Sequence, residues 1–291
     1  MMKQGNQAFL FQSHSVSTQL TRQYGNIRKA TARMGNSFFL YHQRRSEAPS
    51  GLPGLYLFSN ESLSRLNYRM IGPSFSPGHT NFPLLQFFRD HPDFDHYWLI
   101  ENDVRFSGDW HFFFDTFKDT KQDFLTCHVR AHPDEPDWPW WSLHHPHKSI
   151  PLAERLRSFN PIHRLSKASL SFLHQSLSDG WCGHNEVLWP TLLHHSGFTI
   201  MDIGGKGRFT PSSMKDKLYT ESESDGTGSL HSGTMRFRPS FWRVGPEKNK
   251  LYHPVKPLSR LMREKINSQK RQRRLLVRLA RRIRGAFLPR P

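Results

Sequence analysis

The apolar residues of this chain fall into short runs that alternate with stretches of helical spacing. The runs have the length and the aromatic and aliphatic content of buried strands, and they lie at 37–42, 54–59, 97–104, 123–129 and 198–203. The stretches at 80–90, 112–117 and 165–177 repeat apolar residues with the period of a helix. Because strands and helices alternate, the pattern predicts an α/β fold in which helices cover both faces of a sheet.

The two ends of the chain differ from this middle region. Residues 1–35 are polar and hold one short apolar run, at 8–11, so we predict a loosely ordered lead-in there. Residues 258–291 place apolar residues on one face of a predicted helix and surround them with arginines. The predicted folded domain is therefore 36–257, with a polar segment before it and a basic amphipathic helix after it.

Positive charge is concentrated at the carboxyl-terminal end. The chain has 291 residues and a formal net charge of +17, and between 263 and 291 eleven Lys or Arg stand against one acid, Glu264. A basic amphipathic helix lies well in the interface of an anionic membrane, so we predict that residues 258–291 bind an anionic membrane surface. A solvated tail and a nucleic-acid contact are the alternatives, and nucleic acid is the least favoured of the three.

The cysteines and the lack of long apolar segments indicate the compartment. Cys127 and Cys182 are the only cysteines, and both lie in segments with the character of buried structure, where cysteine acts as a small hydrophobe. The amino-terminal segment lacks the apolar stretch of a secretory signal, and no run approaches the ~20 apolar residues of a transmembrane helix. We therefore expect a cytoplasmic protein, free or peripheral on the inner face of the membrane.

The strand predicted at 97–104 ends in two acidic residues, Glu101 and Asp103, separated by Asn102. Because side chains alternate along a strand, the two carboxylates point the same way at the carboxyl edge, where open α/β sheets bind ligands. Two oxygen donors so placed suit a divalent metal and the phosphates it carries, although acids at strand ends also serve as solvated or capping groups. Arg105 adds a positive charge beside them.

Three other segments carry weaker signals. Gly204, Gly205 and Lys206 follow a predicted strand as a glycine-rich turn suited to phosphate, without the full spacing of a P-loop. The Trp- and Pro-rich segment 131–150 predicts either the lining of a ligand cleft or an irregular segment packed over the core. Histidine is a common zinc ligand, and histidines cluster at His144, His145, His147, His194 and His195. No cysteines or acids with zinc-site spacing support these clusters, so chance is a sufficient explanation for them.

Three motifs carry a resemblance to a known family. They are YWLIENDVRFSGDW at 97–110, GWCGHNEVLWPTLLHHSGF at 180–198 and LYHPVK at 251–256. Together they resemble glycosyltransferase-like proteins of the GT-A, or nucleotide-diphospho-sugar transferase, superfamily over roughly residues 36–257. The resemblance implies a Rossmann-type mixed sheet that binds a sugar nucleotide, with a metal held by a motif of the Asp-x-Asp type, in which Glu101 here replaces the first Asp.

The resemblance also implies roles for individual residues. Glu101, Asp103 and His253 would hold a divalent metal, manganese or magnesium. Glu186, which starts a predicted helix after the 180–183 turn, matches the general base of inverting members; from the residue alone it would be a carboxylate that favours the helix dipole. From the residue types, and apart from the resemblance, we expect Asn102, Arg105, Lys206, Gly204 and Gly205 to bind the donor, with Lys206 or Arg105 adding positive charge for its diphosphate.

We therefore expect a metal-dependent glycosyltransferase that moves a sugar from a nucleotide-diphosphate donor to a hydroxyl of a glycan or lipid-linked acceptor. Glycosyl transfer leaves negative charge on the departing diphosphate and removes a proton from the acceptor, which a metal and a carboxylate base would satisfy. Two alternatives are a metal-dependent phosphodiesterase or nuclease that uses the same acids, and a non-catalytic binding protein of the same fold.

Overall fold

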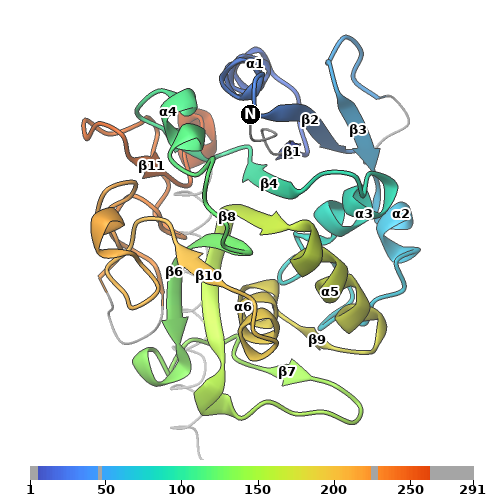
Figure 1. Ribbon diagram of the computed structural model, residues 1–291. Helices are drawn as coiled ribbons and strands as arrows, with labels where there is room; N and C mark the ends of the chain where they lie inside the picture. The colour runs from blue at the N-terminus through green and yellow to red at the C-terminus, as the bar shows by residue number, and fades with distance from the viewer. Residues whose placement is uncertain (1–5, 45–47, 224–228, 263–291) are drawn as a thin grey trace, which may run out of the picture.

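The computed structural model describes residues 6–44, 48–223 and 229–262. Its centre is a seven-stranded sheet with the order β10-β6-β8-β4-β1-β2-β3 (Figure 1). Its strands are β1 Gln7–Ser13, β2 Gly35–His42, β3 Leu55–Phe58, β4 His96–Glu101, β6 Phe124–Ala131, β8 Leu156–Ser166 and β10 Ile200–Asp202. Neighbouring strands are parallel, except that β8 runs antiparallel to both β4 and β6. The sheet is therefore mixed, as predicted.

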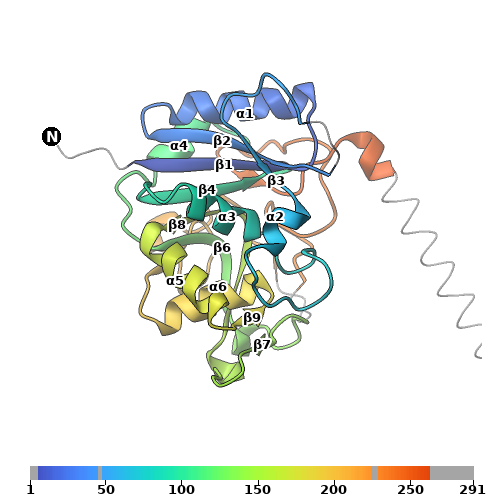
Figure 2. The ribbon, with the colours of Figure 1, turned by 90° about the vertical axis from the view of Figure 1, so that its right-hand side faces the viewer.

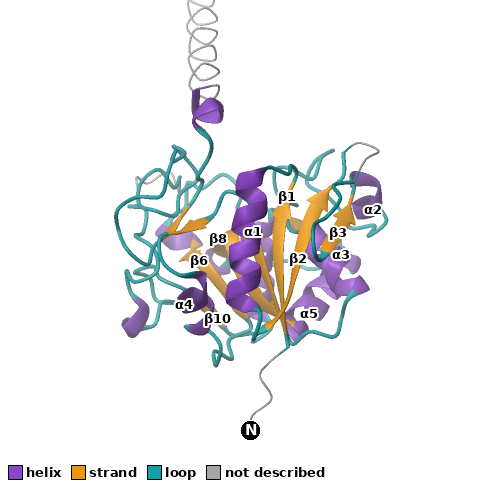
Figure 3. Ribbon diagram, turned by 90° about the horizontal axis from the view of Figure 1, so that it is seen from above, coloured by secondary structure: helices purple, strands orange, loops and turns teal. Residues whose placement is uncertain are grey.

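Helices cover both faces of this sheet (Figures 2 and 3). The helices are α1 Thr18–Thr31, α2 Asn60–Ser64, α3 Phe82–Asp90, α4 Trp110–Asp115, α5 Lys167–Ser178 and α6 Asn185–His195, with short 3-10 turns at His132–Asp134, Leu152–Glu154 and Ser212–Met214. Two separate apolar cores result, because α1 and α4 pack on one face while α3, α5 and α6 pack on the other. The predicted α/β class with covered faces is confirmed.

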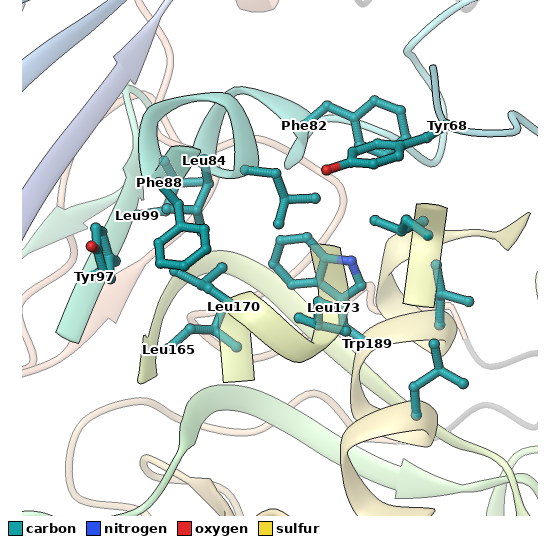
Figure 4. Packing of buried hydrophobic residues seen from close by; sticks show 14 of the residues in the cluster. Tyr68, Phe82, Leu84, Phe88, Tyr97, Leu99, Leu165, Leu170, Leu173 and Trp189 are labelled. Atoms are coloured by element: carbon teal, nitrogen blue, oxygen red, sulfur yellow. The ribbon is translucent and has the colours of Figure 1, made fainter. Parts of the chain in front are cut away.

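Strand β4 shows how the sequence produces these two cores. Trp98 and Ile100 are buried in the core with α1 and α4, and Tyr97 and Leu99 are buried in the core with α3 and α5 (Figure 4). Successive side chains of a strand point to opposite faces, so a strand covered on both sides is a continuous apolar run. This run ends at Glu101, where the chain leaves the sheet.

The expectation of a loosely ordered lead-in over 1–35 is wrong for its described part. β1 lies between β2 and β4 in the sheet, and its residues 8–11 are fully buried. The following helix α1 begins at a Ser17 cap, whose hydroxyl accepts a hydrogen bond from the backbone N–H of Leu20 at 3.3 Å. Only a narrow stripe of α1 is buried against the sheet, and most of its residues are polar. The sequence pattern therefore did not reveal that this segment is an amphipathic helix.

Strand β8 was not predicted either. All eleven of its residues are buried, among them Arg157, His163 and Arg164. The Arg164 guanidinium donates hydrogen bonds to the carbonyl oxygens of Phe117 at 3.0 Å and Thr120 at 2.6 Å. Buried polar groups are tolerated when they are hydrogen-bonded in this way.

Two small antiparallel pairs complete the fold. β5 Arg105–Phe106 pairs with β11 Leu251–Tyr252, and β7 Leu143–His144 pairs with β9 Cys182–Gly183. Both cysteines, Cys127 and Cys182, are buried free thiols, as predicted. Among the described helices, none combines the length and apolar character needed to cross a bilayer.

The last described residues, 258–262, are helical and lie at the edge of the sheet where β1 and β2 end (Figure 3). The basic amphipathic helix predicted for 258–291 otherwise falls at 263–291, outside the described residues.

Candidate functional site

The candidate site lies where the strand order of the sheet reverses. From β1 the chain proceeds outward to β2 and β3, and it then returns to β4 on the other side of β1. In open α/β sheets, ligands bind in the crevice outside the carboxyl ends of the strands at such a reversal. Asn102 joins the two strand ends, because its Nδ2 donates a hydrogen bond to Ser13 Oγ at 2.7 Å.

The three predicted metal ligands meet at this edge. Glu101 ends β4, Asp103 follows two residues later, and His253 comes directly after β11. One ligand atom from each residue lies within 4.8 Å of the others. His253 Nε2 is 3.4 Å from Asp103 Oδ1 and 3.7 Å from Glu101 Oε2. Two carboxylates and an imidazole form a donor set that binds divalent cations.

A short strand pair brings the distant histidine to the two acids. β5 begins two residues after Asp103, and it pairs with β11, which ends just before His253. Beyond this pair, the backbone N–H of Val255 donates to the carbonyl of Asp103 at 2.8 Å. The two segments that carry the predicted metal ligands are thus joined by backbone hydrogen bonds.

The imidazole of His253 is held in one orientation. Its Nδ1 faces the carbonyl oxygen of Arg236 at 2.9 Å, and because a carbonyl only accepts, Nδ1 carries the hydrogen of this bond. The backbone of His253 is fixed as well, by hydrogen bonds with Thr234 at 2.9 Å and Arg236 at 3.1 Å. Nε2 is therefore directed toward the carboxylates, in the way that hydrogen-bonded histidines are oriented toward metals.

The charges of the cluster favour a cation between the two carboxylates. Burial disfavours the charged form of His253, but the carboxylates of Asp103 and Glu101 overcome this effect and raise its pKa to about 10. Burial also opposes the ionised form of Asp103, yet His253 and Lys256 lower the pKa of Asp103 to about 2. A proton on His253 thus supplies the positive charge that a metal would supply, so the residues fit a divalent cation.

Two adjoining cavities meet at the cluster. The first has a volume of about 450 Å³ and lies outside the ends of β1, β2 and β4. The second, of about 270 Å³, lies toward β8 and the start of α6. Glu101 and Asp103 line both cavities, and His253 lines the second. The three predicted metal ligands therefore stand where the two cavities meet.

Glu186 faces the second cavity from the first turn of α6. Its side chain is 20% exposed, and burial raises its pKa to about 7. His184 precedes it as the cap of α6, and burial lowers the pKa of His184 to about 4, so a neutral imidazole accepts a hydrogen bond from the backbone N–H of Glu186 at 3.3 Å. A carboxylate whose pKa is near neutrality is suited to accept a proton from a hydroxyl.

Arg105 has a different position from the one expected. Its guanidinium NH1 donates hydrogen bonds to the carbonyl oxygens of Asn102 and Val104, both at 2.8 Å. Burial lowers the pKa of Arg105 to about 10, and the residue lines neither of the two cavities. Arg105 therefore stabilises the turn that carries Asp103, whereas Asn102 lines the first cavity.

The glycine-rich turn lies away from the metal cluster. The backbone N–H groups of Gly204 and Gly205 donate to Asp202 Oδ1 at 3.0 and 2.9 Å, and the ammonium of Lys206 is 3.7 Å from Asp216. These residues line neither cavity at the cluster. The backbone donors that a phosphate would need are bound to Asp202, so the geometry assigns this turn to the fold and not to the donor.

The structure supports packing over the core for part of the Trp-rich segment, and no residue of 131–150 lines either cavity at the cluster. Trp138 and Trp141 are buried in the core, whereas Trp140 is 40% exposed and stacks on His184 with ring centroids 5.3 Å apart. The paired histidines do not join a metal cluster of three or more ligands in the part of the chain that the structure describes. Instead His145 lies 3.3 Å from Asp179, an ordinary polar pairing.

Several residues that complete the cavities were not singled out from the sequence. Ser13 and Thr80 line the first cavity, and Asn160, from the unpredicted strand β8, lines the second. The polar pair 12–13 that ends the apolar run 8–11 is the same kind of signal as the acids that end β4, and it could have identified Ser13. No local signal identifies Asn160.

A protein family model described as "Protein of unknown function (DUF3405)" matches residues 40–123, a segment that includes β4 and the Glu101–Asp103 motif. A comparison with curated proteins found no match.

The solved structures to which this chain is similar include glycosyltransferases and nucleotidyltransferases. A glycosyltransferase involved in the glycosylation of the major capsid of PBCV-1 aligns with a TM-score of 0.31 and 11% identity, over 58% of this chain and 65% of that chain. The galactosyltransferase LgtC, in complex with donor and acceptor sugar analogs, aligns with a TM-score of 0.37 and 7% identity, over 68% of this chain and 73% of that chain. The 4-diphosphocytidyl-2C-methyl-D-erythritol synthase from Anaerococcus prevotii aligns with a TM-score of 0.40 and 4% identity, over 72% of this chain and 95% of that chain. The chain spans less than two thirds of the capsid glycosyltransferase, and its function is argued below from the site itself.

Proposed function

We propose that this protein is a metal-dependent glycosyltransferase that transfers a sugar from a nucleotide-diphosphate donor to a hydroxyl of a glycan or lipid-linked acceptor. The observation that carries the proposal is the position of Glu101, Asp103 and His253 between two cavities, with Glu186 facing the second. A transferase needs a charged centre between its two substrates and a proton acceptor on the acceptor side.

The first cavity suits the donor nucleotide. Its volume of about 450 Å³ is within the usual range for small-molecule sites, and it lies at the reversal of strand order, where α/β sheets bind nucleotides. Polar side chains from the ends of β1, β2 and β4 surround it, including Ser13, His42 and Asn102. The diphosphate end of a donor in this cavity would lie against Glu101 and Asp103, which are carboxylates and so need a bound cation to accept it.

Glu101, Asp103 and His253 would hold a divalent metal, and when bound it would neutralise charge on the departing diphosphate. Glu186 would accept the proton of the acceptor hydroxyl, since its raised pKa of about 7 leaves a substantial ionised fraction at neutral pH while making it a stronger base than an exposed carboxylate. Lys256 Nζ, 4.0 Å from Asp103 Oδ2, adds positive charge on the acceptor side.

Donor binding by the full chain provides the test. Thermal unfolding is followed with a set of nucleotide-diphosphate sugars, with and without Mn²⁺, because a ligand at about 100 times its Kd stabilises the native state by about 2.7 kcal/mol. We expect stabilisation by a sugar nucleotide only when the metal is present. Asp103→Asn should abolish this effect, while Asp119→Asn, which makes the same change at an exposed position, should retain it.

The alternatives predict other results. A metal-dependent nuclease would be stabilised by an oligonucleotide and not by any sugar nucleotide. Donor binding that is the same with and without metal, or that survives Asp103→Asn, would contradict the proposed role of the cluster. Donor binding without turnover toward any acceptor would favour a binding protein of the same fold. A cytoplasmic location, peripheral on the inner face of the membrane through residues 258–291, remains part of the proposal.

A further inference from the structure

An apolar and basic surface adjoins the candidate site, and it reaches the second cavity through Phe237 and Arg238. We define this rim surface as Phe237, Arg238, Trp242 and Arg243, together with Leu258, Arg260 and Met262. Phe237, Trp242 and Met262 are each 58% exposed, and Leu258 is 55% exposed. Large apolar side chains this exposed, gathered in two neighbouring segments, are characteristic of a surface that contacts a partner.

The rim surface is directly attached to the site. Phe237 and Arg238 themselves line the second cavity. The backbone N–H of Phe241 donates to the carbonyl of Pro254 at 2.8 Å, and that of Lys256 donates to the carbonyl of Phe241 at 2.8 Å. The segment 236–243 thus pairs with the segment that carries His253. Residues 258–262 follow at once, as the orange-red helix on the right of Figure 2.

The charge around these apolar side chains is almost entirely positive. Residues 229–262 contain seven Lys or Arg and one acid, Glu247. Two arginines lie over the exposed rings, with the Arg243 guanidinium 4.3 Å from the centroid of Trp242 and the Arg238 guanidinium 5.3 Å from that of Phe237. Arginine and aromatic side chains in this combination suit the interface of a bilayer with anionic headgroups.

We propose that the rim surface docks on an anionic phospholipid membrane, with Trp242, Leu258 and Met262 in the interface and the arginines on the headgroups. The second cavity then opens toward the lipid surface, so that an acceptor would be presented from the membrane. The statement about the acceptor rests on the proposed glycosyltransferase function, and the docking itself does not.

Other occupants of this surface are disfavoured by its charge and composition. The segment 263–291 has eleven Lys or Arg against one acid, and a second copy of the chain carries a net charge of +17, so both would be repelled by the basic rim surface. A nucleic acid would be attracted by the arginines, but it offers no apolar environment for Leu258 and Met262, which lie one helical turn apart. An anionic membrane satisfies both the charge and the apolar side chains.

The first experiment is sedimentation of the full chain with phosphatidylcholine vesicles, with and without phosphatidylglycerol. We expect binding that requires the anionic lipid, and an about tenfold lower partition coefficient for Trp242→Ala combined with Met262→Gln. Because residues 263–291 are also basic, the comparison is repeated at high salt, where electrostatic attraction is screened and the apolar contribution remains. Phe112→Ala, which removes a 48% exposed ring on α4, is the control and should bind as the unaltered protein does.

Fluorescence quenching at saturating lipid gives a second measurement, which reports insertion of Trp242 and not the strength of binding. Vesicles that contain a brominated phosphatidylcholine quench a tryptophan that enters the bilayer. Trp242→Phe keeps an aromatic ring but removes this fluorophore, so we expect the quenched fraction to fall in the variant while sedimentation is retained. Equal quenching in the two proteins would overturn the proposal, as would equal partition of the double variant at high salt.

Failure of docking and failure of the proposed function give different results. Trp242 lines neither cavity, so Trp242→Ala should keep the metal-dependent donor stabilisation. Donor binding without any effect of the rim variants on vesicles would overturn docking alone. Vesicle quenching through Trp242 without donor binding would leave docking supported and the glycosyltransferase function refuted. Variants that weaken binding to an oligoribonucleotide but not to vesicles would also overturn docking.

Discussion

Binding of a divalent metal should release a proton from His253, and the affinity for the metal should therefore increase with pH. In the metal-free protein the carboxylates of Asp103 and Glu101 overcome the effect of burial and raise the pKa of His253 to about 10. The proton and the metal compete for the same atom, Nε2, because Nδ1 is bound to the carbonyl of Arg236. The metal thus binds only the fraction of molecules in which His253 is neutral.

The size of this effect follows from the pKa. A group with a pKa near 10 is neutral in about one molecule in a thousand at pH 7, and this fraction grows about tenfold with each pH unit up to pH 9. The apparent Kd for Mn²⁺ should fall by the same factor. Asp103, with a pKa of about 2, stays ionised throughout and adds no pH dependence. Glu186 titrates near pH 7, so the measurement is repeated in Glu186→Gln to separate its contribution.

Isothermal titration calorimetry measures both the apparent Kd for Mn²⁺ and the number of protons released on binding. Mn²⁺ is titrated into the metal-free full chain in two buffers with different heats of ionisation, and the difference in observed heat counts the protons released. We expect close to one proton per metal at pH 7 to 8, and close to none in His253→Gln, whose amide does not titrate. A pH-independent Kd with no proton release in the unaltered protein would refute the assigned cluster.

The same pKa fixes the sign of a stability effect in the absence of metal. The pKa of His253 is raised above the usual histidine value of 6.5, so its charged form stabilises the native state fully below that pH, and this stabilisation is lost as the pH rises toward 10. The free energy of unfolding in urea should therefore decrease by a few kcal/mol across this range. Saturating Mn²⁺ should oppose the decrease, because the metal then binds the neutral imidazole.

Three further predictions concern the base, the glycine-rich turn and the centre of the sheet. Glu186→Gln should lower turnover about 10²–10⁴-fold in steady-state assays while donor stabilisation is kept, and unchanged turnover would exclude Glu186 as the base. Lys206→Ala should leave donor stabilisation unchanged, because Lys206 lines neither cavity at the cluster, and a loss would place the turn at the donor. Gly35→Ala should lower the free energy of unfolding in urea by about 2 kcal/mol or more, since a Cβ there would lie 1.9 Å from the carbonyl oxygen of Gln7. Gly25→Ala in α1 is its control; there nothing lies within 4 Å, and it should be neutral or stabilising.

Most of the sheet could be predicted because its strands are buried on both faces. The apolar runs at 37–42, 97–104 and 123–129 correspond to β2, β4 and β6. Such strands can be identified without knowledge of their partners, since burial on both faces favours a continuous apolar run. The acids at the end of β4 could be assigned to the ligand-binding edge by the same reasoning, because an α/β sheet has its crevice outside the carboxyl ends of its strands.

Strand β8 could not be predicted because its polar residues find their partners far away in the sequence. Arg157 is 3% exposed in its side chain and pairs with the buried carboxylate of Glu135, and it also lies over Trp138 at 5.0 Å from the ring centroid. A run with arginines and a histidine has the composition of a surface segment, and only the tertiary contacts make its burial tolerable. Asn160 of the site was hidden together with this strand.

At the glycine-rich turn the sequence predicted a phosphate contact that the geometry does not support, whereas for β8 it missed an element that is present. A strand followed by two glycines and a lysine has the composition of a phosphate site, because glycines expose backbone N–H groups. Composition does not reveal whether those groups are already bonded, and here Asp202, which ends β10, accepts the N–H bonds of both Gly204 and Gly205. A carboxylate just before such a turn competes with any external anion for the same donors.

His253 reaches the two acids through the pairing of β11 with β5, which are far apart in the sequence, so local patterns do not predict its position. The charges of the cluster help to keep it there. Glu101 and Asp103 would repel each other at this edge without a positive charge between them. In the metal-free protein the protonated imidazole provides that charge, and it is delivered by β11, whose pairing with β5 begins just beyond Asp103. A cation that replaces the proton would connect the same two segments through its ligands. Because the segment 236–243 pairs with the residues that follow His253, occupancy of the cluster and order of the rim surface should be coupled, since both depend on the same strand remaining in place.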